Sequence, residues 1–271
     1  MSRILTEWLQ YGFMRQALAA ILILTPLFGM LGTMIVERKM AFFSDALGHS
    51  ALTGIAIGVV FGVSDTNLSM LLFAVAFALL LNQLSRKNAA SNDTVISVFS
   101  SFSIAVGLAI LSKGGNFSQY SSLLVGDVLS ITKKEIGYLA GAFAITLLFW
   151  LFCFNQMHAV SIHRTLAKSW HIKARLMEDL FAALTAVIVM LSIKWVGILI
   201  INALLILPAA ASRNLSENMR EYHFFSILFS MFSGIFGLGI SYFTNTATGP
   251  VIVIVAAAIY FGSLIWLLRK K

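Results

Sequence analysis

Residues 43–50 read Phe43-Ser44-Asp45-Ala46-Leu47-Gly48-His49-Ser50 and carry an acid and an imidazole into the opening turns of a hydrophobic run. In a helix, a separation of four residues places Asp45 and His49 on one face, with Cβ atoms roughly 5–6 Å apart. An ionisable residue inside a membrane span costs about 3 kcal/mol or more, so it usually faces a bundle interior, a partner or a polar cavity. This spacing therefore suits two ligands of one cation.

Ordinary structural roles exist for the same residues. Asp45 could cap a helix N-terminus, and His49 could hydrogen-bond a backbone carbonyl. A histidine one turn after an aspartate, among small residues that let helices approach closely in lipid, favours the cation site. Asp93 opens a later apolar run, and two interpretations of it stay open: a helix cap, or a further group beside the Asp45–His49 pair.

The composition predicts an all-α, polytopic integral membrane protein. Of 271 residues, 59% are hydrophobic and only 11% are charged, against about 25% charged in ordinary soluble domains. The net charge of +8 comes from cations scattered among loops and tails, which favours membrane orientation over nucleic-acid binding. The single cysteine, Cys153, excludes an internal disulfide and a thiolate metal cluster within one chain. We expect one membrane domain over residues 1–271.

Nine apolar runs are candidates for membrane spans. They lie at about 16–36, 46–63, 66–84, 94–112, 136–154, 179–196, 198–212, 223–243 and 249–268. The run at 198–212 is short, contains Pro208 and follows its predecessor closely, so it resembles two short helices at a membrane face more than a span. The residues at 114–129 are polar and then briefly apolar, which favours a re-entrant or interfacial element.

Two further features bear on partners. No GxxxxGK[ST] phosphate loop occurs, so any ATP would be hydrolysed by another polypeptide. The segment 198–222, with Pro208, Arg213 and Glu217, is the predicted docking element for such a partner. His158, His163 and His171 lie in the longest polar connection, about 155–178. Their spacings do not form a compact ligand set and cations lie between them, which favours a solvated loop over metal handling.

Four stretches, in this order, resemble one family. They are Met40 to Ser50, Leu124-Val125-Gly126-Asp127-Val128-Leu129, Lys194-Trp195-Val196-Gly197 running on through Pro208 to Arg213, and Thr248-Gly249-Pro250. The chain is similar to the membrane permeases of bacterial ABC importers for zinc, manganese or iron, and most similar to the zinc-uptake permeases. The resemblance runs from about residue 30 to 265.

The resemblance implies a transport subunit and not an enzyme. It implies that Asp45 and His49 form a transient metal site on the import path and that Pro208 to Arg213 contact the ATPase. No cofactor is expected to be permanently bound, since zinc, or manganese or iron, is the transported ion. The expected partners are a second permease copy, cytoplasmic ATP-binding subunits and an extracytoplasmic metal-binding protein, in the bacterial inner membrane.

The charge bias and the family architecture favour different topologies. Nine spans with an outside N-terminus place 13 of the 19 Lys and Arg residues in the cytoplasm, which the positive-inside bias favours. The family architecture instead implies eight spans, both termini inside, and 198–222 as a short cytoplasmic coupling element. Pro208 and the short run favour eight, with nine as the alternative. In the eight-span arrangement, the segments before Asp45 and Asp93 and the histidine-containing loop face outward.

Two rival classes of function remain at this level. A proton-coupled secondary transporter would also place Asp and His in a span, usually with inverted repeats, which the sequence does not display. A purely structural membrane subunit would need no ionisable pair among glycines. The sequence therefore predicts a divalent metal permease driven by ATP hydrolysis in trans.

Overall fold

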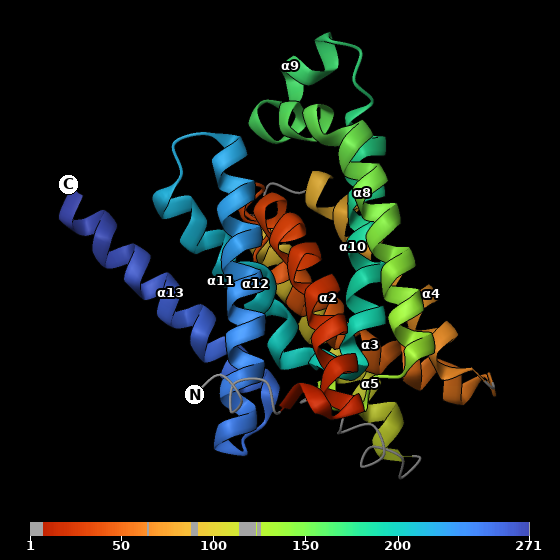
Figure 1. Cartoon of the computed structure of the whole chain (residues 1–271). Helices are drawn as coiled ribbons and strands as arrows, with labels where there is room; N and C mark the ends of the chain where they lie inside the picture. The colour runs from red at the N-terminus through yellow and green to blue at the C-terminus, as the bar shows by residue number, and fades with distance from the viewer. Residues whose placement is uncertain (1–7, 64, 88–91, 114–122, 124–125, 271) are drawn as a thin grey trace. The chain divides into compact units, whose positions relative to one another are not determined.

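The computed structural model describes residues 8–63, 65–87, 92–113, 123 and 126–270, and within these ranges the regular structure is helical. The elements (Figure 1) are η1 (Trp8–Gln10), α2 (Gly12–Glu37), α3 (Phe42–Val60), α4 (Thr66–Lys87), α5 (Asn92–Lys113), η2 (Val128–Ser130), α8 (Lys133–Ile162), α9 (Arg164–Ser169), α10 (Ala174–Val196), α11 (Ile198–Leu215), α12 (Met219–Thr244) and α13 (Thr248–Lys270). Helices satisfy backbone hydrogen bonds within one segment, as lipid requires. The predicted all-α class is confirmed.

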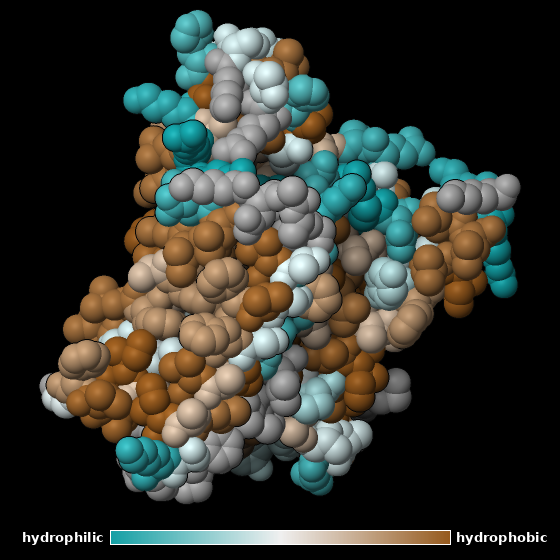
Figure 2. Space-filling model, turned by 180° about the vertical axis from the view of Figure 1, so that it is seen from behind, coloured by the Kyte–Doolittle hydropathy of each residue, from teal (hydrophilic) through white to brown (hydrophobic). Residues whose placement is uncertain are grey.

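Eight of the described helices are long and apolar enough to cross a membrane: α2, α3, α4, α5, α8, α10, α12 and α13. Large apolar side chains are exposed on them, among them Leu151 and Phe152 on α8 and Ile254 and Phe261 on α13. Figure 2 shows hydrophobic residues over much of the visible surface. Apolar surface of this kind fits lipid. By length and composition, the prediction of about eight candidate membrane spans is confirmed, with α11 as a shorter apolar helix. The chain is a multi-pass membrane protein.

The helix after α10 differs from the prediction. Pro208 does not divide the segment into two short helices, because α11 continues without a break from Ile198 to Leu215 with the proline inside it. Proline removes one backbone donor and strains the preceding turn, but buried packing on both sides of Pro208, at Leu205 and Ala209, holds the helix together. Gly197, at φ +86°, joins α10 to α11, a conformation that suits glycine.

The histidine-containing connection is mostly helical, so the expected loop over 155–178 is wrong. α8 extends to Ile162 and α9 follows almost at once. A small apolar cluster of Val160, Ala167 and Ala174 supplies the physical reason, because these side chains are buried only if the segment folds back on itself. The predicted re-entrant element at 114–129 lies largely outside the described residues.

The chain divides into two compact units. Unit 1 comprises Met1–Val36, Ser122–Phe143 and Ser192–Lys271, and unit 2 comprises Glu37–Ser121 and Ala144–Leu191. A single domain over residues 1–271 therefore stays a prediction.

Small residues set the helix spacing in unit 1. A Cβ atom on Gly32 of α2 would lie 1.9 Å from the carbonyl oxygen of Leu205 on α11. Only glycine permits that approach of two helices.

The core of unit 2 is built in the same way around α3. Gly54 of α3 lies against the backbone of Met70 on α4, where a Cβ would stand 2.8 Å from the Met70 Cα. On the α5 side, the Thr53 hydroxyl donates to the Ser103 carbonyl at 2.5 Å. The expectation that small residues after His49 allow close helix approach is confirmed by this packing.

Candidate functional site

Asp45 and His49 lie in the first two turns of α3, in unit 2. The Asp45 Oδ2 and His49 Nε2 atoms are 3.5 Å apart, and the side chains are 34% and 21% exposed. The predicted helical pairing is therefore formed. Both groups remain accessible enough to take a ligand.

The alternative structural roles are not what the geometry shows. The N-cap residue of α3 is Ala41, and Asp45 lies inside the first turn. Among the described residues, the buried His49 Nδ1 has no hydrogen-bond partner, so the imidazole is not held by a backbone carbonyl. A buried ring nitrogen without a partner normally costs free energy. If one ring nitrogen of His49 coordinated a metal ion and the other made a hydrogen bond, both nitrogens would have a partner.

Asp93 lies in the first turn of α5. Its Oδ1 atom is buried and has no hydrogen-bond partner among the described residues. Across the described ranges, no three His, Cys, Asp or Glu side chains gather closely enough to hold a metal ion. The structure thus brings Asp45 and His49 together, and a role for Asp93 beside them stays a prediction.

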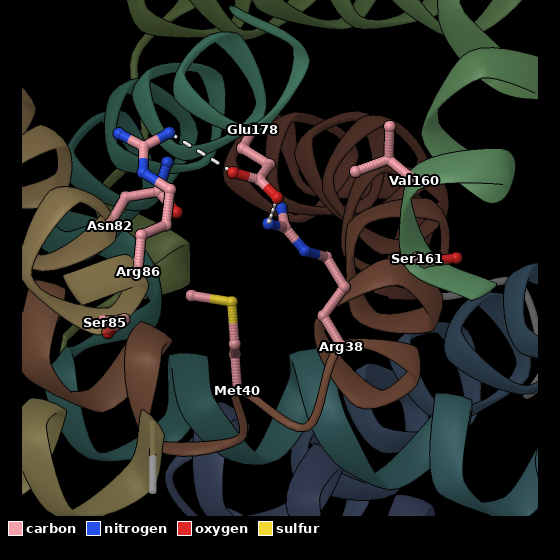
Figure 3. Close-up of a pocket in the computed structure, with 8 residues that line it drawn as sticks. All are labelled: Arg38, Met40, Asn82, Ser85, Arg86, Val160, Ser161 and Glu178. Carbon is pink, nitrogen blue, oxygen red and sulfur yellow. Dashed lines mark hydrogen bonds and ion pairs between the residues drawn. The ribbon is translucent and has the colours of Figure 1, made fainter. Parts of the chain in front are cut away.

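A buried ionic network in unit 2 was not anticipated from the sequence. Glu178, on α10, lies between two guanidinium groups, at 3.4 Å from Arg38 and 3.2 Å from Arg86 (Figure 3). Arg86 also pairs with Asp179 at 2.9 Å, and Asn82 donates to the same carboxylate at 2.6 Å. One feature of the sequence could have indicated this network. Glu178 and Asp179 form an acidic pair at the start of an apolar run, in a chain with only 11 acidic residues.

This network lines a cavity of about 250 Å³ whose walls come from Arg38, Met40, Asn82, Ser85, Arg86, Val160, Ser161 and Glu178. Two guanidinium groups neutralise Glu178, which makes the cavity a poor cation site. Removing either partner of a buried ion pair leaves an uncompensated charge. The network therefore fastens the segment before α3 to the ends of α4 and α10, and so supports the helix that carries Asp45 and His49.

The three histidines of the α8–α9 region do not form a ligand set. His158 is buried in α8 with its ring edge-on to Phe154, at 4.4 Å between centroids. His163 is exposed and accepts from the Leu166 N–H at 3.4 Å, which caps α9. His171 is exposed with φ +59°. Only the latter two fit the predicted solvated environment.

The predicted coupling residues lie in unit 1. Pro208 is buried and shapes α11 from within, whereas Arg213 and Glu217 are exposed at the α11–α12 connection. The Arg213 guanidinium lies over the Tyr222 ring, 5.4 Å from its centroid. Glu217 is 78% exposed on its side chain and pairs with Lys270 at 3.3 Å. A charged tip of this kind is available to a soluble partner.

Two of the motifs quoted from the sequence meet in unit 1. A Cβ atom on Gly126 would lie 2.4 Å from the Gly197 backbone nitrogen, and the Asp127 N–H donates to the Lys194 carbonyl at 3.4 Å. Lys194 in turn pairs with Glu135 at 2.8 Å. These glycines serve packing between segments distant in sequence. Of the Leu124–Leu129 motif, Leu124 and Val125 lie outside the described residues.

A multi-pass helical membrane protein with a carboxylate–imidazole pair on one candidate span fits the transporter class. The model of the ABC 3 transport family matches residues 10–267, and the chain belongs to that family. It is an ABC-type metal permease, and its relatives are transport permease subunits.

Two curated relatives cover nearly the whole chain. The high-affinity zinc uptake system membrane protein ZnuB of Haemophilus influenzae is 30% identical over 92% of this chain and 95% of its own length. The manganese transport system membrane protein MntC of Listeria innocua is 27% identical over 93% of this chain and 90% of its own. Among solved structures, PsaBC from Streptococcus pneumoniae in complex with Fab matches with a TM-score of 0.85 and 25% identity, over 100% of both chains.

Proposed function

We propose that this chain is the permease subunit of an ATP-driven zinc importer. The observation that carries the proposal is the Asp45–His49 pair, 3.5 Å apart in the opening turns of α3. Imidazole nitrogen with carboxylate oxygen is a donor set that zinc accepts readily. Two protein ligands bind weakly, which suits a conduit because the ion must also leave.

Manganese is the alternative cargo, because the MntC relative is similar at nearly the same identity. Manganese favours oxygen ligands, so it would need more carboxylate, carbonyl or water oxygens around the pair than zinc does. Asp45 is 34% exposed on its side chain, so water oxygens could complete such a site, and Asp93 of α5 is the proposed further carboxylate. The imidazole nitrogen and the ZnuB relative favour zinc.

The energy source in this proposal is supplied by other subunits. The sequence contains no phosphate-binding loop, so ATP-binding subunits would dock at the cytoplasmic face of two permease copies, and an extracytoplasmic binding protein would deliver the ion. ATP binding would bias the permease pair between outward-open and inward-open states through differential contacts. The exposed Arg213 and Glu217 are the proposed contacts for the ATPase.

The test is ion uptake into proteoliposomes by the complete complex, with zinc and manganese supplied separately and in competition. Zinc uptake is expected to exceed manganese uptake, and Asp45→Ala or His49→Ala is expected to abolish most of it while the complex still assembles. His163→Ala and Asp65→Ala serve as matched controls, because both side chains are exposed and both lie outside α3 in the sequence. Normal uptake by a well-assembled His49→Ala complex contradicts the site, and preferred manganese uptake reassigns the cargo.

A further inference from the structure

Helix directions in unit 1 carry information on membrane topology. α2 and α12 are antiparallel: the Ser230 hydroxyl donates to the Thr25 carbonyl at 2.7 Å, and further along α2, Thr33 Oγ1 meets His223 Nε2 at 2.9 Å. Contacts thus move forward along α2 as they move backward along α12. The same reversal is visible in Figure 1 between the red α2 and the light blue α12.

α11 runs in the same direction as a membrane-spanning helix. Gly249, at the start of α13, lies against Ile200 of α11. Fourteen residues later on both helices, Asn214 Nδ2 donates to Ser263 Oγ at 3.0 Å. α11 is therefore parallel to α13 along nearly its whole length. Its 18 residues extend about 27 Å, against the roughly 30 Å of a hydrocarbon core. α11 is shorter than the eight long helices, and a helix of this length crosses with local thinning of the bilayer.

The directions of α2 and α12 determine whether the number of membrane crossings between them is odd or even. Every crossing reverses the chain, so if only the eight long helices crossed, α12 would be the seventh crossing and would run parallel to the first, α2. It runs antiparallel, so the number of crossings counted from α2 to α12 must be even. Because each of the eight long helices is long and apolar enough to cross, we add one crossing between α2 and α12 and remove none. The apolar stretch Leu123–Leu129 is too short to cross. We infer that α11 is a ninth membrane crossing, so that α2 begins outside the cytoplasm and the Asp45–His49 pair lies toward the cytoplasmic end of the ion path.

The charge distribution decides which side is cytoplasmic. With nine crossings, 13 of the 19 Lys and Arg residues share one side. They are Arg38, Lys39, Arg86, Lys87, Arg164, Lys168, Lys173, Arg175, Arg213, Arg220, Arg269, Lys270 and Lys271. The positive-inside bias assigns that side to the cytoplasm. The ends of α2, α4, α8, α11 and α13 then lie in the cytoplasm, and the connections after α3 and α12 lie outside.

This topology revises two expectations about sidedness. The segments before Asp45 and Asp93 and the histidine-bearing α9 region face inward instead of outward. The charged α11–α12 tip with Arg213 and Glu217 stays cytoplasmic, now at the end of a membrane-embedded helix. In its bearing on transport the inference rests on the proposed function: α3 would hold the ion near its release side, where weak binding by two ligands allows departure to the cytoplasm.

Single-cysteine labelling of the full-length protein in intact cells tests the topology. In a Cys153→Ala background, Asn67→Cys lies just after the α3–α4 connection and Thr165→Cys lies in α9, and both positions are exposed. An impermeant maleimide is expected to label Asn67→Cys in intact cells and Thr165→Cys only after permeabilisation. The opposite pattern, or equal labelling of both before permeabilisation, overturns the ninth crossing.

Two control positions report the same sides in both topologies. Asn245→Cys, between α12 and α13, is outside with eight or nine crossings, and Glu217→Cys is inside in both. Labelling of every variant after permeabilisation shows that the protein is present and that each cysteine is accessible. If Asn67→Cys or Thr165→Cys stays unreactive, Val63→Cys or Ser169→Cys, in the same connection, takes its place. Because labelling needs no transport, it succeeds or fails independently of the proposed zinc uptake.

Discussion

Glu178→Gln removes one negative charge from the buried network while keeping the side-chain size. Glu178 is 6% exposed and faces Arg38 and Arg86, which are 11% and 16% exposed on their side chains. Removing one member of a buried ion pair costs about 3–5 kcal/mol. Glutamine still accepts one hydrogen bond and Arg86 keeps Asp179 at 2.9 Å, so we expect the lower end, about 3 kcal/mol.

Thermal unfolding of the purified permease in detergent measures this loss. At roughly 2–4 °C per kcal/mol for a chain of this size, the midpoint is expected to fall by about 6–12 °C. Glu217→Gln is the matched control, because the Glu217–Lys270 pair is 78% and 58% exposed on its side chains and such surface pairs contribute little.

Equal unfolding midpoints for Glu178→Gln and Glu217→Gln would refute the reasoning, since burial would then make no difference to an ion pair in this protein. A double-mutant cycle adds a second check. In an Arg38→Gln background, Glu178→Gln is expected to lower the free energy of unfolding by less than in the native chain. The reason is that Arg38, one of the two cations that would lose its partner, is already absent. Additive costs would show that the two side chains do not interact energetically.

Three further outcomes are expected. Gly32→Ala should lower the unfolding midpoint, since its Cβ would stand 1.9 Å from a backbone oxygen, whereas Gly239→Ala, with nothing within 4 Å, should leave it unchanged or raise it; equal midpoints contradict the close α2–α11 packing. Asp93→Asn should reduce metal uptake without reducing stability if Asp93 joins the ion path, and full uptake removes it from the path. Charge reversal at both Arg213 and Glu217 should loosen the ATPase or uncouple ATP hydrolysis from uptake, measured by co-purification and ATPase assay, and unchanged assembly and coupling place the contact elsewhere.

The amino-acid sequence by itself determined the class of fold and the pairing of Asp45 with His49. Long apolar runs have few solutions in lipid, since helices satisfy their own backbone hydrogen bonds. The four-residue spacing of Asp45 and His49 is likewise a local helical property, so their approach to 3.5 Å needed no knowledge of distant segments.

Tertiary structure decided what depends on contacts between segments far apart in sequence. Glu178 meets Arg38 and Arg86 only because three helix ends converge, and no local pattern records that convergence. The continuity of α11 through Pro208 is another case. A proline and a short apolar run predict a break in the helix, but burial against neighbouring helices keeps α11 continuous. The direction of α12 against α2, set by contacts such as Thr33 with His223, could be read only from the packed helices, because an apolar run has the same composition whichever way it crosses the membrane.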